Sequence, residues 1–316
     1  GFKEDNIFEI NTSSFSAILK DCFRLKREFK QFNSIYNVVL EPFTRFSHLI
    51  GFWLGVDRLS GCHPFNAEGG YLGNLISHPV IYNPHLHASQ QFVSLVEGIS
   101  NIKGEKPSSK IKIFNQIQNR ARFKSNSQEK LFLKDKILQI CPSIKNKKWI
   151  ILNCNASDIV PLRKWPLSRF AEVGRRLLNY NNEIGIILTG TKSEKKACDV
   201  LINKLESPKT INLAGQTSFR ELLTLYELSL LLISNDSGPV HFASSTNINI
   251  LALYGPENPS IFGPLSPNSK NLYLNLSCSP CVSPLNQKKS LCSNNICMNS
   301  ITSDYVYKEA IKLIDI

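Results

Sequence analysis

The fold class of this chain follows from one stretch, LLLISNDSGPVH, which covers residues 230–241. Its first part, from Leu230 to Ser234, is almost entirely apolar and has the length of a buried β-strand. Polar residues, a glycine and a proline come next, and this combination is typical of the start of a helix. We therefore predict a strand, a tight turn and a helix from Val240 to Ser245, which is one step of an α/β fold.

The rest of the sequence repeats this alternation of strands and helices. Strands are predicted at 36–40, 149–153, 184–189, 211–213 and 248–254, and helices at 15–32, 45–54, 168–178, 193–205 and 218–228. Parallel strands need a crossover of about a dozen residues, which is usually a helix. The alternation therefore predicts parallel sheets covered by helices, and the fold class is α/β.

The pattern weakens between about residues 103 and 148, where polar and basic residues, Gly104, Pro107 and Pro142 interrupt it. Such a stretch is typical of a connection between domains. We predict an N-terminal α/β domain with its linker over residues 1–140. A second α/β domain then covers residues 141–316 and includes a cysteine-containing loop at 278–297 and a terminal helix.

Composition limits the classes of partner. The chain has 37 Lys and Arg against 25 Asp and Glu, a net charge of +12, which would attract phosphorylated sugars, anionic lipid headgroups or nucleic acid. The basic residues are dispersed and lack the interleaved aromatic residues of a single-strand-binding platform, so we predict no nucleic-acid partner. No apolar run approaches the length of a membrane span, and five cysteines scattered singly favour a reducing compartment, the cytoplasm.

The turn at residues 236–239 has the chemistry of an anion-binding site. Backbone N–H groups at the start of a helix favour a diphosphate, and Gly238 permits its close approach. Asp236 would repel phosphate, so its carboxylate is better suited to bind hydroxyl groups of a sugar or ribose, and His241 could add a hydrogen bond. On the local sequence alone, a simple capped helix explains the turn equally well.

Longer motifs resemble those of glycosyltransferase family 9, the heptosyltransferases. They are Ser234-Asn235-Asp236-Ser237-Gly238-Pro239-Val240-His241, Leu253-Tyr254-Gly255-Pro256 and Phe262-Gly263-Pro264, and the resemblance covers about residues 149–316. It implies a GT-B architecture, in which two Rossmann-like domains face each other across a cleft and the C-terminal one binds most of the donor. It also implies inverting transfer without a metal cofactor, from a nucleotide-sugar donor.

The resemblance implies a set of donor-binding residues. Asp236, Ser237, Gly238 and His241 belong to the turn, and Ser157 precedes a basic segment that meets the donor. In that segment the family usually has a lysine two residues before the tryptophan, where Arg163 stands here, and Lys164 follows it, so either cation could contact phosphate. Glu194 stands where the family has a ribose-binding glutamate, although an acid in the first turn of a helix also has a structural explanation.

The family's catalytic base is an aspartate in a glycine-containing loop after its first strand, and nothing before Phe8 matches that segment. We therefore expect that the chain lacks this part of the family's N-terminal domain, and we name no catalytic base. Whether this chain alone catalyses transfer depends on that segment.

Four cysteines cluster late in the sequence, at Cys278, Cys281, Cys292 and Cys297. Their spacing is compatible with a structural zinc site. Free thiols or a disulfide-prone loop are the alternatives.

The predicted function is transfer of a heptose, or a similar sugar, from an ADP-linked donor to a lipopolysaccharide core or another glycolipid. The expected location is the cytoplasm, with peripheral contact at the anionic inner face of the inner membrane. A GT-B transferase that uses another nucleotide sugar is one alternative. A non-catalytic protein that binds nucleotide sugars is another.

Overall fold

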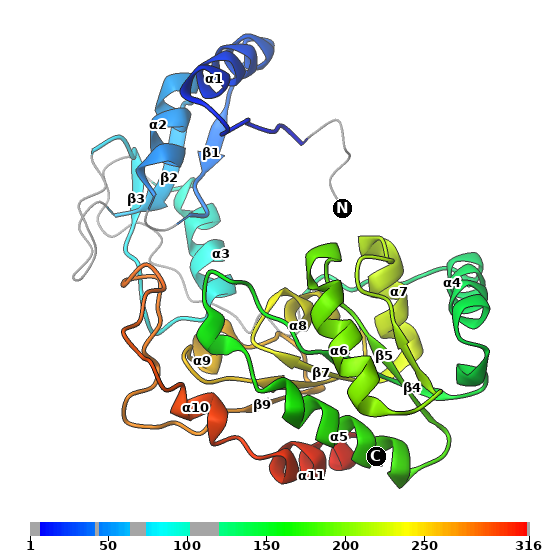
Figure 1. Ribbon diagram of the computed structural model, residues 1–316. Helices are drawn as coiled ribbons and strands as arrows, with labels where there is room; N and C mark the ends of the chain where they lie inside the picture. The colour runs from blue at the N-terminus through cyan, green and yellow to red at the C-terminus, as the bar shows by residue number, and fades with distance from the viewer. Residues whose placement is uncertain (1–6, 42–43, 64–73, 102–119, 315–316) are drawn as a thin grey trace. The chain divides into compact units, whose positions relative to one another are not determined.

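The computed structural model describes residues 7–41, 44–63, 74–101 and 120–314 (Figure 1). The chain forms two compact units, residues 1–114 and 115–316. Helix α4 (Ser127–Ile140) packs against α7 (Phe219–Leu228), and Lys136 and Glu221 form an ion pair of 2.7 Å between them. The second unit therefore begins before residue 141, where we had predicted the start of the C-terminal domain.

The first unit contains a three-stranded parallel sheet with the order β1-β2-β3. Gly55 follows the last residue of helix α2, Leu54, and its φ of 71° lies in the left-handed region that glycine adopts at little cost. The buried side chains of Cys62, Val80 and Leu95 form the core between the sheet and α3. The elements of this unit are β1 (Tyr36–Val38), β2 (Arg58–Cys62), β3 (His78–Val80), α1 (Phe15–Phe29), α2 (Arg45–Leu54) and α3 (Ala88–Gly98).

The second unit contains a six-stranded sheet with the order β6-β5-β4-β7-β8-β9, in which every neighbouring pair is parallel. The central strands are buried on both faces, as the apolar runs in the sequence predicted. The strands are β4 (Lys148–Asn153), β5 (Ile184–Leu188), β6 (Thr210–Asn212), β7 (Ser229–Asn235), β8 (Asn249–Leu253) and β9 (Ser269–Leu272).

Helices cover both faces of this sheet, which confirms the expected α/β class. On one face, Ile150, Leu152 and their neighbours pack against α5, α6 and α11. On the other face, Ile151, Ile187 and their neighbours pack against α4, α7 and α8. The remaining helices are α5 (Leu167–Tyr180), α6 (Lys195–Leu205), α8 (Gly238–Ala243), α9 (Pro259–Phe262), α10 (Ile296–Asn299) and α11 (Ser303–Ile314).

The strand order decides where a ligand can bind in the second unit. The chain moves outward from β4 to β5 and β6, and then returns to the other side of β4 to build β7, β8 and β9. In such sheets a crevice forms beyond the carboxyl ends of the two strands where the direction reverses, which here are β4 and β7. The turn at residues 236–239 follows β7 directly and therefore lies at this crevice.

Among the described residues, no helix combines the length and the apolar character needed to cross a bilayer.

Candidate donor-binding site

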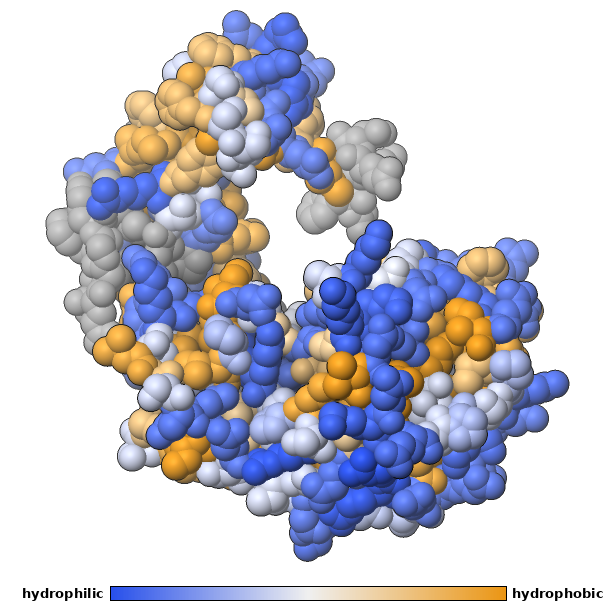
Figure 2. Space-filling view, in the orientation of Figure 1, coloured by the Kyte–Doolittle hydropathy of each residue, from blue (hydrophilic) through white to orange (hydrophobic). Residues whose placement is uncertain are grey.

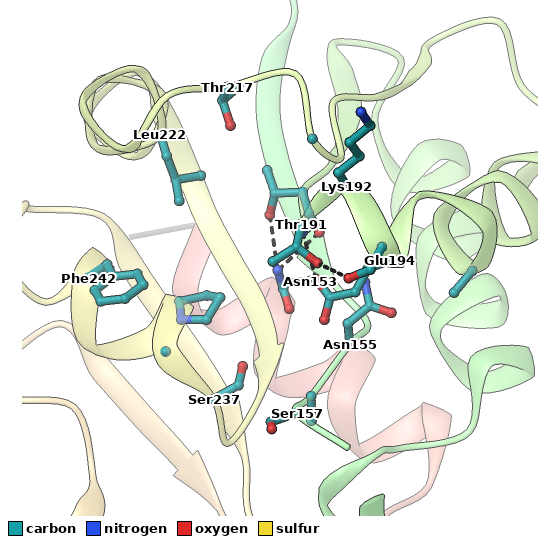
Figure 3. A pocket seen from close by; sticks show the side chains of 18 of the residues that line it. Asn153, Asn155, Ser157, Thr191, Lys192, Glu194, Thr217, Leu222, Ser237 and Phe242 are labelled. Atoms are coloured by element: carbon teal, nitrogen blue, oxygen red, sulfur yellow. Dashed lines mark hydrogen bonds between the residues drawn. The ribbon is translucent and has the colours of Figure 1, made fainter. Parts of the chain in front are cut away.

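A pocket of about 940 Å³ lies at the carboxyl ends of β4, β5, β6 and β7 (Figure 3). All its walls come from the second unit. Its volume falls within the range of roughly 300–1,000 Å³ that is usual for small-molecule sites. Of the predicted donor-binding residues, the pocket is lined by Ser157, Arg163, Lys164, Glu194, Ser237 and Gly238.

Buried polar contacts hold the ends of β4 and β7 together. The side chain of Asn235 donates to the carbonyl of Cys154 at 3.0 Å and accepts from the backbone N–H of Trp165 at 3.1 Å. Trp165 is itself buried, and its indole N–H donates to the carbonyl of Ile301 at 2.9 Å. These bonds fix the segment that carries Arg163 and Lys164 at the rim of the crevice.

The turn after β7 offers fewer free amides than the sequence suggested. Pro239 has no N–H, and the N–H of Val240 donates to the carbonyl of Ser237 at 3.2 Å. Helix α8 has only six residues, so its dipole is short. Attraction of an anion to this pocket therefore depends more on nearby cations than on the helix.

Arg163 is the buried cation of the pocket wall, with a side chain that is 11% exposed. Its Nη2 donates to the carboxylate of Glu257, and its Nε lies 3.5 Å from Oδ2 of Asp236. Lys164 points to the surface instead, where Nζ lies 2.6 Å from Oδ1 of Asp158. Both cations line the pocket, and Arg163 is the one with a fixed position.

Asp236 lies behind Arg163 and is not part of the pocket wall. Its side chain is 4% exposed. Burial raises the pKa of Asp236 to about 7, although Arg163 acts in the opposite direction, and the neighbouring Glu257 raises the pKa further. In this arrangement Asp236 helps to hold Arg163, and direct contact between its carboxylate and donor hydroxyl groups stays a prediction.

The loop after β5 forms a second wall of the pocket. Glu194 accepts a hydrogen bond from the backbone N–H of Thr191 at 2.7 Å in a capping box. This contact agrees with a structural role for Glu194 in the first turn of a helix. Nearby, the side chain of Asn153 donates to the carbonyl of Thr189 at 3.0 Å. Figure 3 shows Asn153, Thr191 and Glu194 close together on this side of the pocket.

Aromatic and apolar side chains gather on another side of the pocket. The rings of Phe219 and Phe242 are edge to face with centroids 5.0 Å apart. Leu222 also lines the pocket, on the same side as Phe242 (Figure 3). Phe219 and Phe242 are 57% and 40% exposed. Half-exposed rings in a pocket wall provide a surface on which a flat aromatic ligand can pack.

This geometry agrees with the result of a family comparison. Residues 66–291 match the model of glycosyltransferase family 9 (heptosyltransferase), which is more than half of the 316 residues. The chain belongs to glycosyltransferase family 9. The family predicted from the motifs around Asp236 is thus confirmed.

Curated relatives that are named heptosyltransferases are similar over part of their length. Lipooligosaccharide heptosyltransferase 2 of Campylobacter jejuni is 31% identical over 175 residues, which is 54% of this chain and 53% of the relative. Lipopolysaccharide heptosyltransferase 2 of Salmonella typhimurium is 27% identical over 135 residues, which is 42% of this chain and 38% of the relative. The chain therefore spans about half or less of the length of these relatives.

Solved family 9 structures share the fold over most of the chain. ADP-heptose lipopolysaccharide heptosyltransferase II of Escherichia coli has a TM-score of 0.65 and 19% identity, covering 93% of this chain and 80% of that one. A family 9 transferase from Veillonella parvula has a TM-score of 0.69 and 18% identity, covering 96% and 81%. These likenesses agree with the predicted GT-B fold.

The residues that line the pocket of this family 9 chain differ in part from the predicted donor-binding residues. His241 is exposed and does not line the pocket, and its contact with the donor stays a prediction. In contrast, the sequence interpretation missed Thr191, Lys192, Phe219 and Phe242, which do line it. Their positions in the predicted fold could have indicated some of them, because Thr191 and Lys192 follow a predicted strand and Phe219 lies at the start of a predicted helix.

The four late cysteines of this family 9 chain do not form a recognisable metal site. All four are free thiols, with Cys278 exposed, Cys281 and Cys292 half-buried, and Cys297 buried. Over the described residues, no three Cys, His, Asp or Glu side chains form a group that could hold a metal ion. The geometry gives no support to the zinc alternative.

Proposed function

We propose that this chain acts as an inverting glycosyltransferase that moves a heptose, or a similar sugar, from an ADP-linked donor to a lipopolysaccharide core or related glycolipid. The observation that carries the proposal is the pocket at the crevice between β4 and β7, with Arg163 in its wall. Its family 9 relatives are named heptosyltransferases, and one solved E. coli heptosyltransferase holds ADP.

The pocket has a suitable surface for each part of a nucleoside diphosphate. Arg163, Lys164 and Lys192 supply positive charge for the diphosphate. Phe219 and Phe242 supply the packing surface for the base. Hydroxyl groups of the ribose can accept or donate hydrogen bonds at the polar side chains that also line the pocket.

Transfer in this proposal depends on stabilising the leaving group. The acceptor hydroxyl oxygen attacks the anomeric carbon from the face opposite the diphosphate, and the bond between that carbon and the diphosphate oxygen breaks. ADP leaves with the electron pair and gains negative charge, which the fixed guanidinium of Arg163 stabilises. The hydroxyl proton passes to a base, and we assign that base to none of the described residues.

Calorimetric titration of the chain with ADP-heptose, UDP-sugars and GDP-sugars tests the proposed donor. We expect ADP-heptose to bind more tightly than the others. Arg163→Met should weaken its binding by about 10- to 100-fold, because a charge-assisted contact to phosphate is lost. The matched control is Arg175→Met, which removes an exposed arginine on α5 that does not line the pocket.

Tighter binding of a UDP- or GDP-sugar would show that the donor is not ADP-linked, and the proposal of a glycosyltransferase would stand. Binding of no nucleotide sugar, or equal losses in Arg163→Met and Arg175→Met, would reject the donor site.

The proposed acceptor is part of a membrane lipid, and the first unit has a surface suited to an anionic bilayer. Phe15, Leu19 and Phe23 form one stripe along α1 and are 74%, 40% and 58% exposed, and Phe52 on α2 is 64% exposed. Figure 2 shows hydrophobic residues gathered over α1 and α2 beside hydrophilic ones. Exposed basic residues on or just after α1 complete the pattern of an interfacial helix: Lys20, Arg27 and Lys30.

Sedimentation with phosphatidylglycerol vesicles tests this contact. We expect binding that falls several-fold in Phe15→Ser/Phe52→Ser and that is weaker with phosphatidylcholine vesicles. The control is Phe132→Ser, which removes a phenylalanine of α4 that is 64% exposed. Unchanged binding in the double variant would exclude this surface.

A further inference from the structure

Glu257 is a buried carboxylate that the motif comparison did not assign to the site. It follows β8 in the turn Gly255-Pro256-Glu257, and its side chain is 2% exposed. Burial of a carboxylate is costly unless cations and hydrogen bonds compensate it. Here two cations do so, since Arg163 forms an ion pair with Oε1 and Nζ of Lys288 lies 3.8 Å from the same oxygen.

Glu257 and Asp236 contact the guanidinium of Arg163 at two neighbouring nitrogen atoms. Nη2 bonds to Glu257, and Nε lies 3.5 Å from Asp236. Nε and Nη2 form one edge of the planar guanidinium, so the two buried carboxylates hold that edge. The opposite end, at Nη1, is not used by either carboxylate, and Arg163 also lines the pocket.

A carboxylate this close to the pocket would repel a diphosphate, and the positive charge of Lys288 counteracts this repulsion. Lys288 belongs to the cysteine-containing loop, and its Nζ also lies 5.9 Å from the centroid of the Phe262 ring. Its charge offsets that of Glu257. The charge of Arg163 then faces Asp236, whose pKa of about 7 leaves it partly protonated at neutral pH.

We propose that Glu257 is a positioning residue that holds the guanidinium of Arg163 by one edge and so presents its other end to the diphosphate of the donor. The inference rests on the proposed function, because it requires that the pocket binds a nucleoside diphosphate. The role belongs to Glu257 and not to Asp236 alone, because Glu257 makes the direct hydrogen bond and Asp236 does not.

Titrations with ADP and with adenosine test the proposal, because only ADP carries the diphosphate. Glu257→Ala should weaken ADP binding about tenfold and change adenosine binding less than twofold. Glu257→Gln keeps an oxygen that can accept from Nη2, so its ADP affinity should return to within about threefold of the wild type. Far-ultraviolet circular dichroism and thermal melting identify any variant that fails to fold, and Glu257→Gln keeps the shape if Glu257→Ala does not.

A double-mutant cycle with Arg163→Met separates positioning from a general structural role. If Glu257 acts through Arg163, Glu257→Gln and Glu257→Ala should change ADP affinity less than twofold in the Arg163→Met background. Equal losses for ADP and adenosine, an unchanged or higher ADP affinity in Glu257→Ala, or additive losses in the cycle would each overturn the proposal. If the wild type binds neither ADP nor an ADP-sugar, the proposed function fails and this inference fails with it.

Discussion

Nε of Arg163 lies 3.5 Å from Oδ2 of Asp236, and both atoms are buried. Within the described part of the chain neither atom has a hydrogen-bond partner, so the two charges attract each other without a well-formed bond. A buried carboxylate in this position retains its proton to an unusually high pH. The pair therefore links the stability of the second unit to pH.

Asp236→Asn should reduce the pH dependence of stability. The pKa of Asp236 is about 7 in the folded chain and near 3.8 when it is exposed, so the folded state holds the proton more tightly. Its contribution to stability is complete below about pH 4 and is lost as the pH rises through about 7. The free energy of unfolding of Asp236→Asn, relative to the wild type, should therefore rise by about 2–4 kcal/mol between pH 4 and 8.

Urea unfolding followed by tryptophan fluorescence measures this difference, since Trp149 and Trp165 lie in the second unit. Asp158→Asn is the control, because Asp158 is exposed and Lys164 lowers its pKa. Its contribution has the opposite sign and is lost as the pH falls. Parallel pH profiles for the wild type and Asp236→Asn would contradict the role of burial.

Phe219→Ala and Phe242→Ala should weaken adenosine binding. Packing of a base on an aromatic ring contributes about 1–3 kcal/mol, so we expect a loss of about 5- to 150-fold for the ring that contacts the base. The two rings also support each other through their contact at 5.0 Å, so the double variant should lose less than the sum of the single losses. Titration with adenosine, with Phe132→Ala as the control, measures this; full affinity in both single variants would exclude the aromatic surface.

Gly215→Ala should disturb the pocket more than an ordinary glycine substitution. Gly215 has a φ of 72°, and an added Cβ would lie 2.7 Å from the backbone Cα of Lys192. The backbone strain and this overlap together should cost about 2–4 kcal/mol and displace the loop that carries Thr191 and Glu194. ADP binding should weaken accordingly.

Gly55→Ala is the matched control for that prediction. Gly55 has nearly the same φ, 71°, but no atom lies within 4 Å of its added Cβ. It should lose only the conformational part, about 1 kcal/mol, and keep its ADP affinity. Equal effects of the two substitutions on ADP titrations and thermal melting would show that contact with Lys192 does not matter.

The sequence predicted the buried strands of the second unit well because burial on both faces leaves an unbroken apolar run. The strand expected at residues 230–234 is β7, Ser229–Asn235, and the one expected at 149–153 is β4, Lys148–Asn153. Edge strand β9, Ser269–Leu272, was missed because it pairs on one side only and keeps polar residues. Strands β2 and β3 of the first unit were missed as well; β2 contains Gly61, and β3 has only three residues, one of them Pro79.

The sequence predicted the site residues whose position depends on the end of a strand. It did not predict those whose position depends on contacts between side chains distant in sequence. Ser237 and Gly238 line the pocket because they follow β7 at the crevice. Asp236 does not line it, and its side chain lies in a buried charge cluster with Arg163 and Glu257, which are distant in sequence. No local pattern encodes the meeting of these three side chains. The pairing of Phe219 with Phe242 is equally non-local, since the rings come from α7 and α8.

Thiol labelling should distinguish free late cysteines from a zinc-bound loop. If the thiols are free, Cys278 should react first because it is exposed. Cys297 should react slowly, because it is buried and burial raises its pKa, which lowers the fraction of reactive thiolate at neutral pH. Labelling of reduced protein with a maleimide, followed by peptide mass spectrometry, gives the order. A zinc-bound loop would instead protect all four cysteines until a chelator is added, and metal analysis of the same sample would approach one ion per chain.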